Sequence, residues 1–171
     1  MVEKDLYKKA ALLGYLVKTM KEKKQVAIVG KTYIQKLTYL LTLNSVTDFE
    51  YTLYHYGPYS FEANNELNFA KDIGILNIDW NSDKGFNIFP GPEKDRYESL
   101  LTEDEKTKIN EISDRYINFS AKQLSIVATA KFLEKNMQLS EKKTLVEMIG
   151  IIKPNLERNE IEDALKKDGL I

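Results

Sequence analysis

Residues 26–32, with the sequence VAIVGKT, end like a phosphate-binding loop, in which a Lys and a hydroxyl residue contact phosphate and magnesium. That motif requires a Gly five residues before Gly30, and the chain has Gln25 there. The residues between them are apolar and mostly β-branched, whereas a phosphate-binding loop must expose backbone N–H groups. We therefore expect no nucleotide site here and interpret the segment as a tight connection into a helix.

The chain offers few other residues for catalysis or metal binding. His55 is the only histidine and there is no cysteine, so the usual zinc ligand sets are missing. A Ser-His-Asp arrangement would have to use His55, but no Ser lies in a Gly-x-Ser-x-Gly turn. Acidic residues 103–105 resemble a carboxylate cluster, but they suit a first helical turn, where the helix dipole favours negative charge. The sequence predicts a non-enzyme with no catalytic residue, no metal site and no cofactor.

Tyrosines gather around residue 55, and two interpretations of them stay open. Tyr54, Tyr56 and Tyr59 are candidate partner-binding residues, because a Tyr ring is rigid and its hydroxyl can still form a hydrogen bond at an interface. Tyrosine is also favoured in strands for packing reasons alone, which would place these rings, together with Tyr51, in or beside the core.

Composition and charge limit the class of protein. The 171 residues are 43% hydrophobic and 30% charged, as in an ordinary folded domain, and no apolar run approaches the length of a membrane span. The absence of Cys is compatible with the cytoplasm, which we expect to be the location. Residues 1–36 carry a net charge of +6, whereas residues 37–86 carry −5. If nucleic acid is bound, the candidate contacts lie in the basic segment: Lys21, Lys23, Lys24 and Lys31.

Hydrophobic periodicity predicts how the first half is organised. We expect helices over residues 5–22 and from Thr32, the latter opened by a Thr32–Gln35 capping box. An alternating, Tyr-rich strand is expected over residues 49–56, followed by a Gly57-Pro58 turn in which Gly57 takes a positive φ. Three further elements complete this half: a helix capped by Ser60 and ended by Gly74, a hairpin around the loop 81–85, and a boundary at residues 90–92.

The second half is predicted to be helical. Capping boxes at Thr102–Glu105 and Ser120–Gln123 open two helices, Ser140 can cap a third, and Asn159 can start the last. The predicted fold is a mostly helical α+β protein. It has a winged-helix-like unit with a small antiparallel hairpin over residues 1–92 and a helical unit over residues 93–171 packed on it, with a single compact domain as the alternative.

Three segments of the chain are similar to a known group of proteins: residues 34–41 (IQKLTYLL), 54–61 (YHYGPYSF) and 74–76 (GIL), with weaker similarity at 124–133, 153–154 and 169–171. They resemble the group of prokaryotic proteins around YwgA and, more distantly, the Panacea domain of SocA-type antitoxins. That domain also has a helix like LQKLLYY and a Tyr-Gly-Pro turn, although this chain has Tyr59-Ser60 where Panacea proteins more often have Val and a polar residue. The resemblance implies partner binding rather than a known activity.

Two functions follow as hypotheses. The first is a regulatory binding module of antitoxin type that contacts another protein, such as a toxin, through its tyrosines. The alternative is a winged-helix DNA-binding regulator, with the helix after Ser60 in the major groove or the Lys-rich segment on the phosphate backbone. The acids and the single Lys of that helix favour the first hypothesis, because acids facing phosphates would be repelled.

Overall fold

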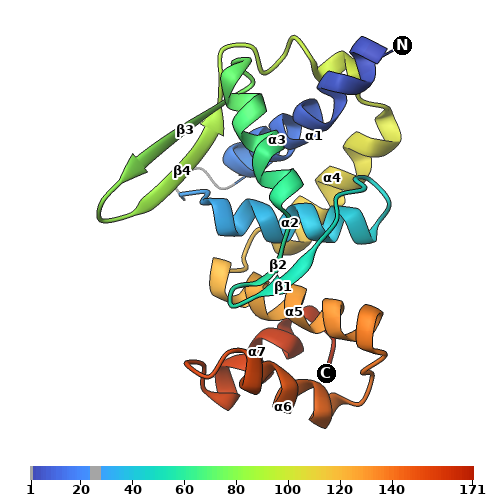
Figure 1. Cartoon of the computed structure of the whole chain (residues 1–171), viewed down its shortest axis with the longest axis vertical. Helices are drawn as coiled ribbons and strands as arrows, with labels where there is room; N and C mark the ends of the chain where they lie inside the picture. Colours follow the sequence, from blue (N-terminus) through green and yellow to red (C-terminus); the bar gives the residue numbers. More distant parts are fainter. Residues whose placement is uncertain (1, 24–27) are drawn as a thin grey trace.

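A computed structural model describes residues 2–23 and 28–171 of the chain, and it shows a mostly helical α+β fold (Figure 1). Strands in the described part form two separate two-stranded antiparallel sheets. The first pairs Thr52 with Tyr59, and the second pairs Leu76 with Pro90. The elements are α1 (Val2–Lys23), α2 (Lys31–Leu43), β1 (Thr52–Tyr54), β2 (Gly57–Tyr59), α3 (Phe61–Asp72), β3 (Leu76–Asn81), β4 (Gly85–Pro90), η1 (Glu98–Leu100), α4 (Glu103–Tyr116), α5 (Ala121–Met137), α6 (Lys142–Ile152) and α7 (Arg158–Asp168).

Several helix starts lie where the sequence predicts them. The Ser60 hydroxyl accepts a hydrogen bond from the Ala63 backbone at the start of α3. Complete capping boxes open α4 at Thr102 and α5 at Ser120. In each box the cap side chain accepts a hydrogen bond from the backbone N–H three residues on, and the side chain of that later residue accepts one from the backbone N–H of the cap residue. These predictions are confirmed.

Three other predicted starts are wrong. Helix α2 begins one residue earlier than predicted, with Gly30 at the N-cap and no side-chain cap, so Thr32 lies inside its first turn. Helix α6 begins after Glu141 rather than Ser140. Helix α7 begins after Glu157, which forms a capping box with Glu160, rather than at Asn159. The N-cap of α7 is a Glu, whereas the prediction looked for the usual N-cap residues Ser, Thr, Asn and Asp.

The predicted strand over residues 49–56 is also shorter than expected. Only residues 52–54 form β1, and His55 and Tyr56 make the turn that the sequence places at Gly57-Pro58. Gly57 does take a positive φ of 92°, as predicted, but it opens the returning strand β2. Other parts of the protein bind the carbonyls of this hairpin, and a local sequence pattern cannot reveal such contacts.

The buried residues form two clusters that meet in α5. The first fills the space among α1, α2, α3, the β3–β4 hairpin and α4, and it includes Leu124 and Val127 of α5. The second lies among α5, α6 and α7, and it includes Ile126 and Leu133 of α5. The clusters therefore do not divide at residue 92, and the two-unit organisation stays a prediction.

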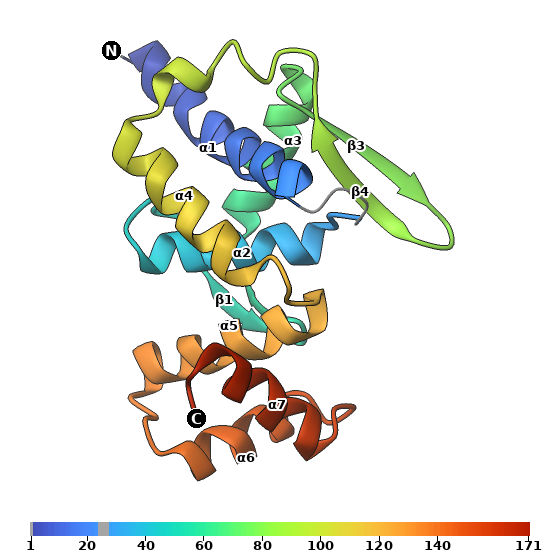
Figure 2. The same cartoon turned by 180° about the vertical axis from the view of Figure 1, so that it is seen from behind.

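The two ends of the molecule are joined through a small hairpin. Helices α1 to α4 lie at one end, with the β3–β4 hairpin projecting from them, and α5 to α7 lie at the other (Figures 1 and 2). The β1–β2 hairpin lies between α2 and α5, and β2 contacts both helices. This position makes the hairpin part of the junction between the two ends.

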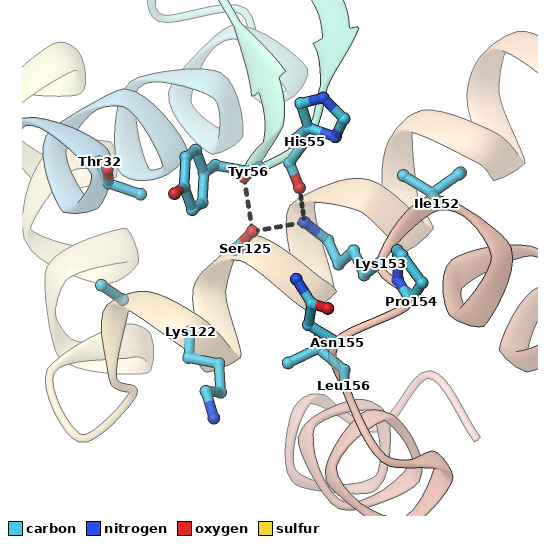
Figure 3. A pocket seen from close by; sticks show the side chains of 11 residues that line it. Thr32, His55, Tyr56, Lys122, Ser125, Ile152, Lys153, Pro154, Asn155 and Leu156 are labelled. Carbon is cyan, nitrogen blue, oxygen red and sulfur yellow. Dashed lines mark hydrogen bonds between the residues drawn. The ribbon is translucent and has the colours of Figure 1, made fainter.

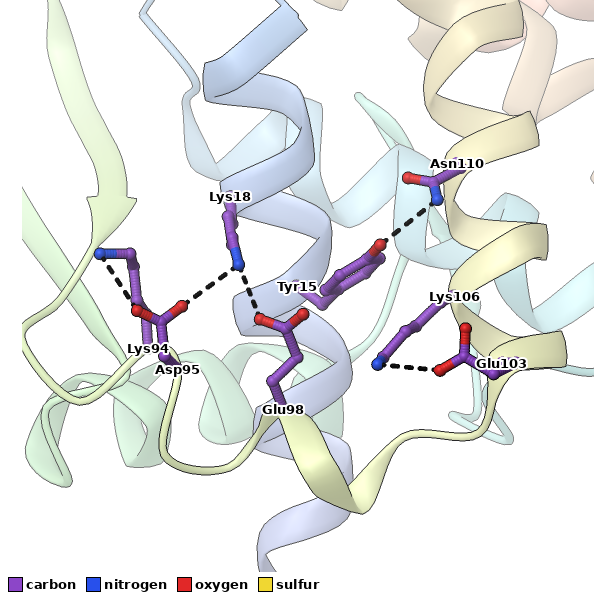
Figure 4. Close-up of polar contacts among 8 residues, drawn as sticks. All are labelled: Tyr15, Lys18, Lys94, Asp95, Glu98, Glu103, Lys106 and Asn110. Atoms are coloured by element: carbon purple, nitrogen blue, oxygen red, sulfur yellow. Dashed lines mark hydrogen bonds and ion pairs between the residues drawn. The ribbon is translucent and has the colours of Figure 1, made fainter.

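Polar contacts attach α1 to the segment that leads into α4. Lys18 Nζ donates to Glu98 Oε2 at 2.7 Å and to Asp95 Oδ1 at 3.2 Å (Figure 4). On the next face, the Asn110 amide donates to the Tyr15 hydroxyl at 3.3 Å. Because α4 also contributes Ile109 and Tyr116 to the first buried cluster, this connection is both polar and apolar.

Within the described ranges, no helix is both long enough and apolar enough to cross a membrane. The same residues contain no group of three or more His, Cys, Asp or Glu side chains that could hold a metal ion.

Candidate functional site

The β1–β2 turn is held by side chains from three directions. Lys36 Nζ of α2 donates to the Pro58 carbonyl at 2.7 Å. Lys153 Nζ, directly after α6, donates to the His55 carbonyl, also at 2.7 Å (Figure 3). The Ser125 hydroxyl of α5 donates to the third carbonyl, that of Tyr56, at 2.5 Å and accepts from Lys153 at 2.8 Å. The backbone of this short hairpin is thus fixed by tertiary contacts rather than by its own few ladder bonds.

The exit from the hairpin is fixed as well. Gln35 Nε2 donates to the Ser60 carbonyl at 2.9 Å, and Ser60 N donates back to Gln35 Oε1 at 3.1 Å. Both residues are buried. Since Ser60 also caps α3, one side chain of α2 sets where the hairpin ends and where α3 begins.

Gly57 lets the hairpin approach α5 closely. A Cβ at this position would lie 2.7 Å from Thr129 Oγ1 and 3.1 Å from the Ser125 carbonyl oxygen. The positive φ of Gly57 also disfavours any side chain. Two independent constraints therefore require glycine here.

The two lysines that hold the turn are buried cations. Lys36 is 1% exposed and Lys153 is 7% exposed, and no carboxylate of the described residues forms an ion pair with either. Burial lowers the pKa of Lys36 to about 7, and the nearby charge of Lys153 contributes in the same direction. Burial also lowers the pKa of Lys153 to about 8. Such shifts in a pocket lining are typical of functional sites, although structural networks produce them too.

Aromatic side chains project from this rigid hairpin and from the first turn of α3. Tyr54, Tyr56 and Phe61 are 47%, 73% and 62% exposed, and Tyr59 is half-buried. Tyr54, Tyr59 and Phe61 contact one another edge to face, with ring centroids 5.1 to 6.0 Å apart. We call Tyr54, Tyr56, Tyr59 and Phe61 the aromatic patch. Tyr51, in contrast, packs against Tyr39 with 4.9 Å between ring centroids and belongs to the partly buried interior.

The structure thus brings two of the three predicted tyrosines, Tyr54 and Tyr59, into one cluster and adds Phe61, which the sequence pattern did not single out. Phe61 follows Ser60 directly, so its exposure depends on the first turn of α3. An apolar residue just after a predicted N-cap, outside the buried stripe of its helix, is the signal that could have identified it.

Two pockets flank the hairpin, and Thr32 and Tyr56 line both. The smaller, of about 290 Å³, lies beside the aromatic patch and includes Lys31, Lys36 and Asn64 in its lining. The larger, of about 610 Å³, lies between the turn, the start of α5 and the segment after α6 (Figure 3). Its lining is Thr32, His55, Tyr56, Ala121, Lys122, Ser125, Ile152, Lys153, Pro154, Asn155 and Leu156.

Three of the four lysines predicted for nucleic-acid contact have partners within the protein. Lys21 Nζ donates to Asn87 Oδ1 at 2.8 Å, and Lys23 forms an ion pair with Asp114. Lys31 Nζ lies over the Phe86 ring, 4.4 Å from its centroid. Lys24 lies outside the described residues.

The other segments with chemically suggestive residues also make contacts within the chain, and residues 26 and 27 of the first of them lie outside the described residues. The Val29 carbonyl accepts a hydrogen bond from Ile88 N at 2.8 Å, so the chain before α2 runs along β4. The carboxylate of Glu105 serves in the capping box and in a 2.9 Å ion pair with Lys8. His55 lies in the exposed turn, where its backbone carbonyl accepts the hydrogen bond from Lys153.

No protein-family model matches the chain, and no curated protein matches it significantly. The resemblance to YwgA-like and Panacea proteins therefore stays a prediction.

Proposed function

We propose that this chain is a non-enzymatic regulatory module, similar to YwgA-like and Panacea proteins, that binds a partner protein through the aromatic patch. In an antitoxin the partner would be a toxin, and the module would act in the cytoplasm. The observation that supports this most directly is the exposure of Tyr54 and Tyr56 on a hairpin whose carbonyls are held by buried lysines, with Phe61 exposed at the start of α3 beside them.

Exposure and rigidity together favour binding. Aromatic side chains dominate the energy of protein interfaces because each buries a large apolar area with few rotatable bonds. A hairpin already fixed in the free protein loses little conformational entropy on association. The patch also borders the 290 Å³ pocket, which gives a partner side chain a place to insert.

The winged-helix DNA regulator is the second candidate. Its support is the order of three helices followed by a β-hairpin, α1, α2, α3 and β3–β4, together with the positive charge of residues 1–36. Against it, Lys21, Lys23 and Lys31 contact groups of the same chain, and Glu62 is exposed on α3 beside Phe61. These contacts favour a protein partner over phosphate.

Affinity capture from the native host tests the proposal. The bait is the full chain, compared with Tyr54→Ala, Tyr56→Ala and Phe61→Ala by quantitative mass spectrometry, and any partner is then purified and titrated as a binary complex. We expect at least one patch variant to weaken that complex tenfold or more, since hot-spot truncations cost about 2 kcal/mol or more. Trp80→Ala is the matched control, because Trp80 is 65% exposed on β3, outside the patch.

The result that would contradict the proposal is a partner bound equally well by the wild type and by all three patch variants. Circular dichroism of each variant shows whether a weakened interaction reflects the surface or the fold.

A further inference from the structure

The larger pocket combines an apolar lining with one buried cation. Tyr56, Ile152, Pro154 and Leu156 supply apolar surface, and Lys153 supplies the charge (Figure 3). Its volume of about 610 Å³ lies in the range of small-molecule sites. The pocket is thus of a size and character suited to a small amphipathic ligand.

No acidic residue lines this pocket in the described part of the chain. The charge of Lys122, the second lysine in the lining, is neutralised by an ion pair of 2.8 Å between its Nζ and Glu160. Its side chain also points away from Lys153 (Figure 3). Of the two lysines in the pocket lining, Lys153 is therefore the one without a carboxylate partner among the described residues.

One N–H group of the Lys153 ammonium has no acceptor among the described residues. An ammonium carries three N–H groups, and Lys153 Nζ has two acceptors among the described residues, the His55 carbonyl and Ser125 Oγ. Ser125 Oγ accepts one of the Lys153 N–H groups and donates its own hydrogen to the Tyr56 carbonyl, but as a neutral hydroxyl it supplies no counter-charge. A buried cation without a counter-charge is costly, and an anionic ligand would remove much of that cost.

We propose that the 610 Å³ pocket binds a small monocarboxylate with an apolar body, whose carboxylate pairs with Lys153 Nζ while its body lies against Tyr56, Ile152 and Leu156. The Asn155 amide, which also lines the pocket, is a second donor for the carboxylate. A single cation with apolar walls suits one carboxylate better than a phosphate, which is usually held by several cations or by Arg. This site does not depend on the aromatic patch having a protein partner.

The proposal is tested on the full chain with a series of straight-chain carboxylates from acetate to dodecanoate, each compared with its neutral amide. Calorimetry and NMR should show saturable binding that strengthens with chain length, as apolar area is buried. The medium-chain acid, octanoate, should bind at least tenfold more tightly than octanamide. Lys153→Met keeps the apolar stem and should abolish the preference for the acid, whereas Lys142→Met, which removes an exposed lysine outside the pocket lining, should keep it.

NMR titration of the Lys153 ammonium provides a test that requires no variant to fold. Bound carboxylate favours the charged lysine, so saturating octanoate should raise the Lys153 pKa above its value of about 8, and octanamide should not. Equal binding of acid and amide, a Lys153 pKa unchanged by saturating carboxylate, or no saturable binding of any member of the series would each overturn the proposal.

Discussion

Lys36 and Lys153 both donate hydrogen bonds to backbone carbonyls of the β1–β2 hairpin, although one lies in α2 and the other follows α6. Each bond is 2.7 Å long, and Lys153 is close enough to lower the pKa of Lys36. Two amines are therefore buried around one hairpin, where a charge on Lys153 disfavours a charge on Lys36. Their placement connects the two ends of the molecule through the hairpin that carries the aromatic patch.

The first prediction concerns pH. Lys36 has a pKa of about 7 in the folded protein, against 10.5 for an ordinary lysine. Between these values the unfolded chain holds more protons than the folded one, so the free energy of unfolding should rise with pH, and Lys153 should add to the rise above about pH 8. The slope should be on the order of 1 kcal/mol per pH unit for each lysine. Urea unfolding at a series of pH values measures it.

The urea unfolding series should be measured below pH 10. Burial raises the pKa of Tyr33 from 10.0 to about 12, so at higher pH the unfolded tyrosine loses its proton first and stability falls. Lys36→Met should remove a large part of the rise between pH 7 and 10, whereas the exposed-lysine variant Lys142→Met should retain it. A Lys36→Met protein with the wild-type slope would show that this lysine is not the source.

The second prediction compares two glycines with the same backbone requirement. Gly57 has a φ of 92° and Gly169 a φ of 83°, but only at Gly57 would a Cβ meet other atoms, 2.7 Å from Thr129 Oγ1. Gly169→Ala should therefore cost about 1 kcal/mol of backbone strain, and Gly57→Ala about 3 kcal/mol, because overpacking is added to strain. Thermal and chemical unfolding measure both. Equal losses in the two variants would mean that the contact with α5 is not tight.

The third prediction concerns the carboxylate that attaches α7. Asp168 has a fully buried side chain that accepts from the Tyr116 hydroxyl at 2.7 Å and pairs with Lys131 at 3.1 Å and Arg115 at 3.3 Å. Asp168→Ala should destabilise the protein by about 3 kcal/mol, because it leaves a half-buried lysine and a buried hydroxyl without their partner. The effect should appear first as faster amide hydrogen exchange in α7.

The matched control is Asp163→Ala, which removes an exposed carboxylate from the same helix and should change stability by less than about 0.5 kcal/mol. Equal effects of the two substitutions would contradict the structural role of Asp168.

Local signals account for the parts of the fold that the sequence predicted. The caps at Ser60, Thr102 and Ser120 depend on residues three positions apart, so a short window contains all the information. The β1–β2 hairpin does not have this property, because its carbonyls are bound by Lys36 of α2 and by Lys153, which follows α6. Its position is therefore decided by tertiary contacts.

The candidate site was predictable to a similar extent. The Tyr-rich pattern indicated the patch, but it could not show that Tyr51 turns inward against Tyr39. The sequence does not mark Lys36 and Lys153 as site residues, because a lysine is ordinarily exposed. The sequence contains one hint, because Lys36 lies between the apolar residues Ile34 and Leu37. The structure shows that α2 is buried at every position from Tyr33 to Leu41, so this lysine is buried with them.

The last prediction separates the protein-binding module from the DNA-binding regulator. We expect no sub-micromolar binding of duplex DNA at physiological salt, because Lys21, Lys23 and Lys31 already contact Asn87, Asp114 and Phe86, respectively. Fluorescence anisotropy at about 50 and about 200 mM salt measures this, since DNA affinity that depends on neutralised phosphates falls steeply as the salt concentration rises. Tight binding that shows this fall, survives Tyr54→Ala and disappears on charge reversal of the four predicted lysines would favour the regulator instead. That reversal replaces Lys21, Lys23, Lys24 and Lys31 with Glu.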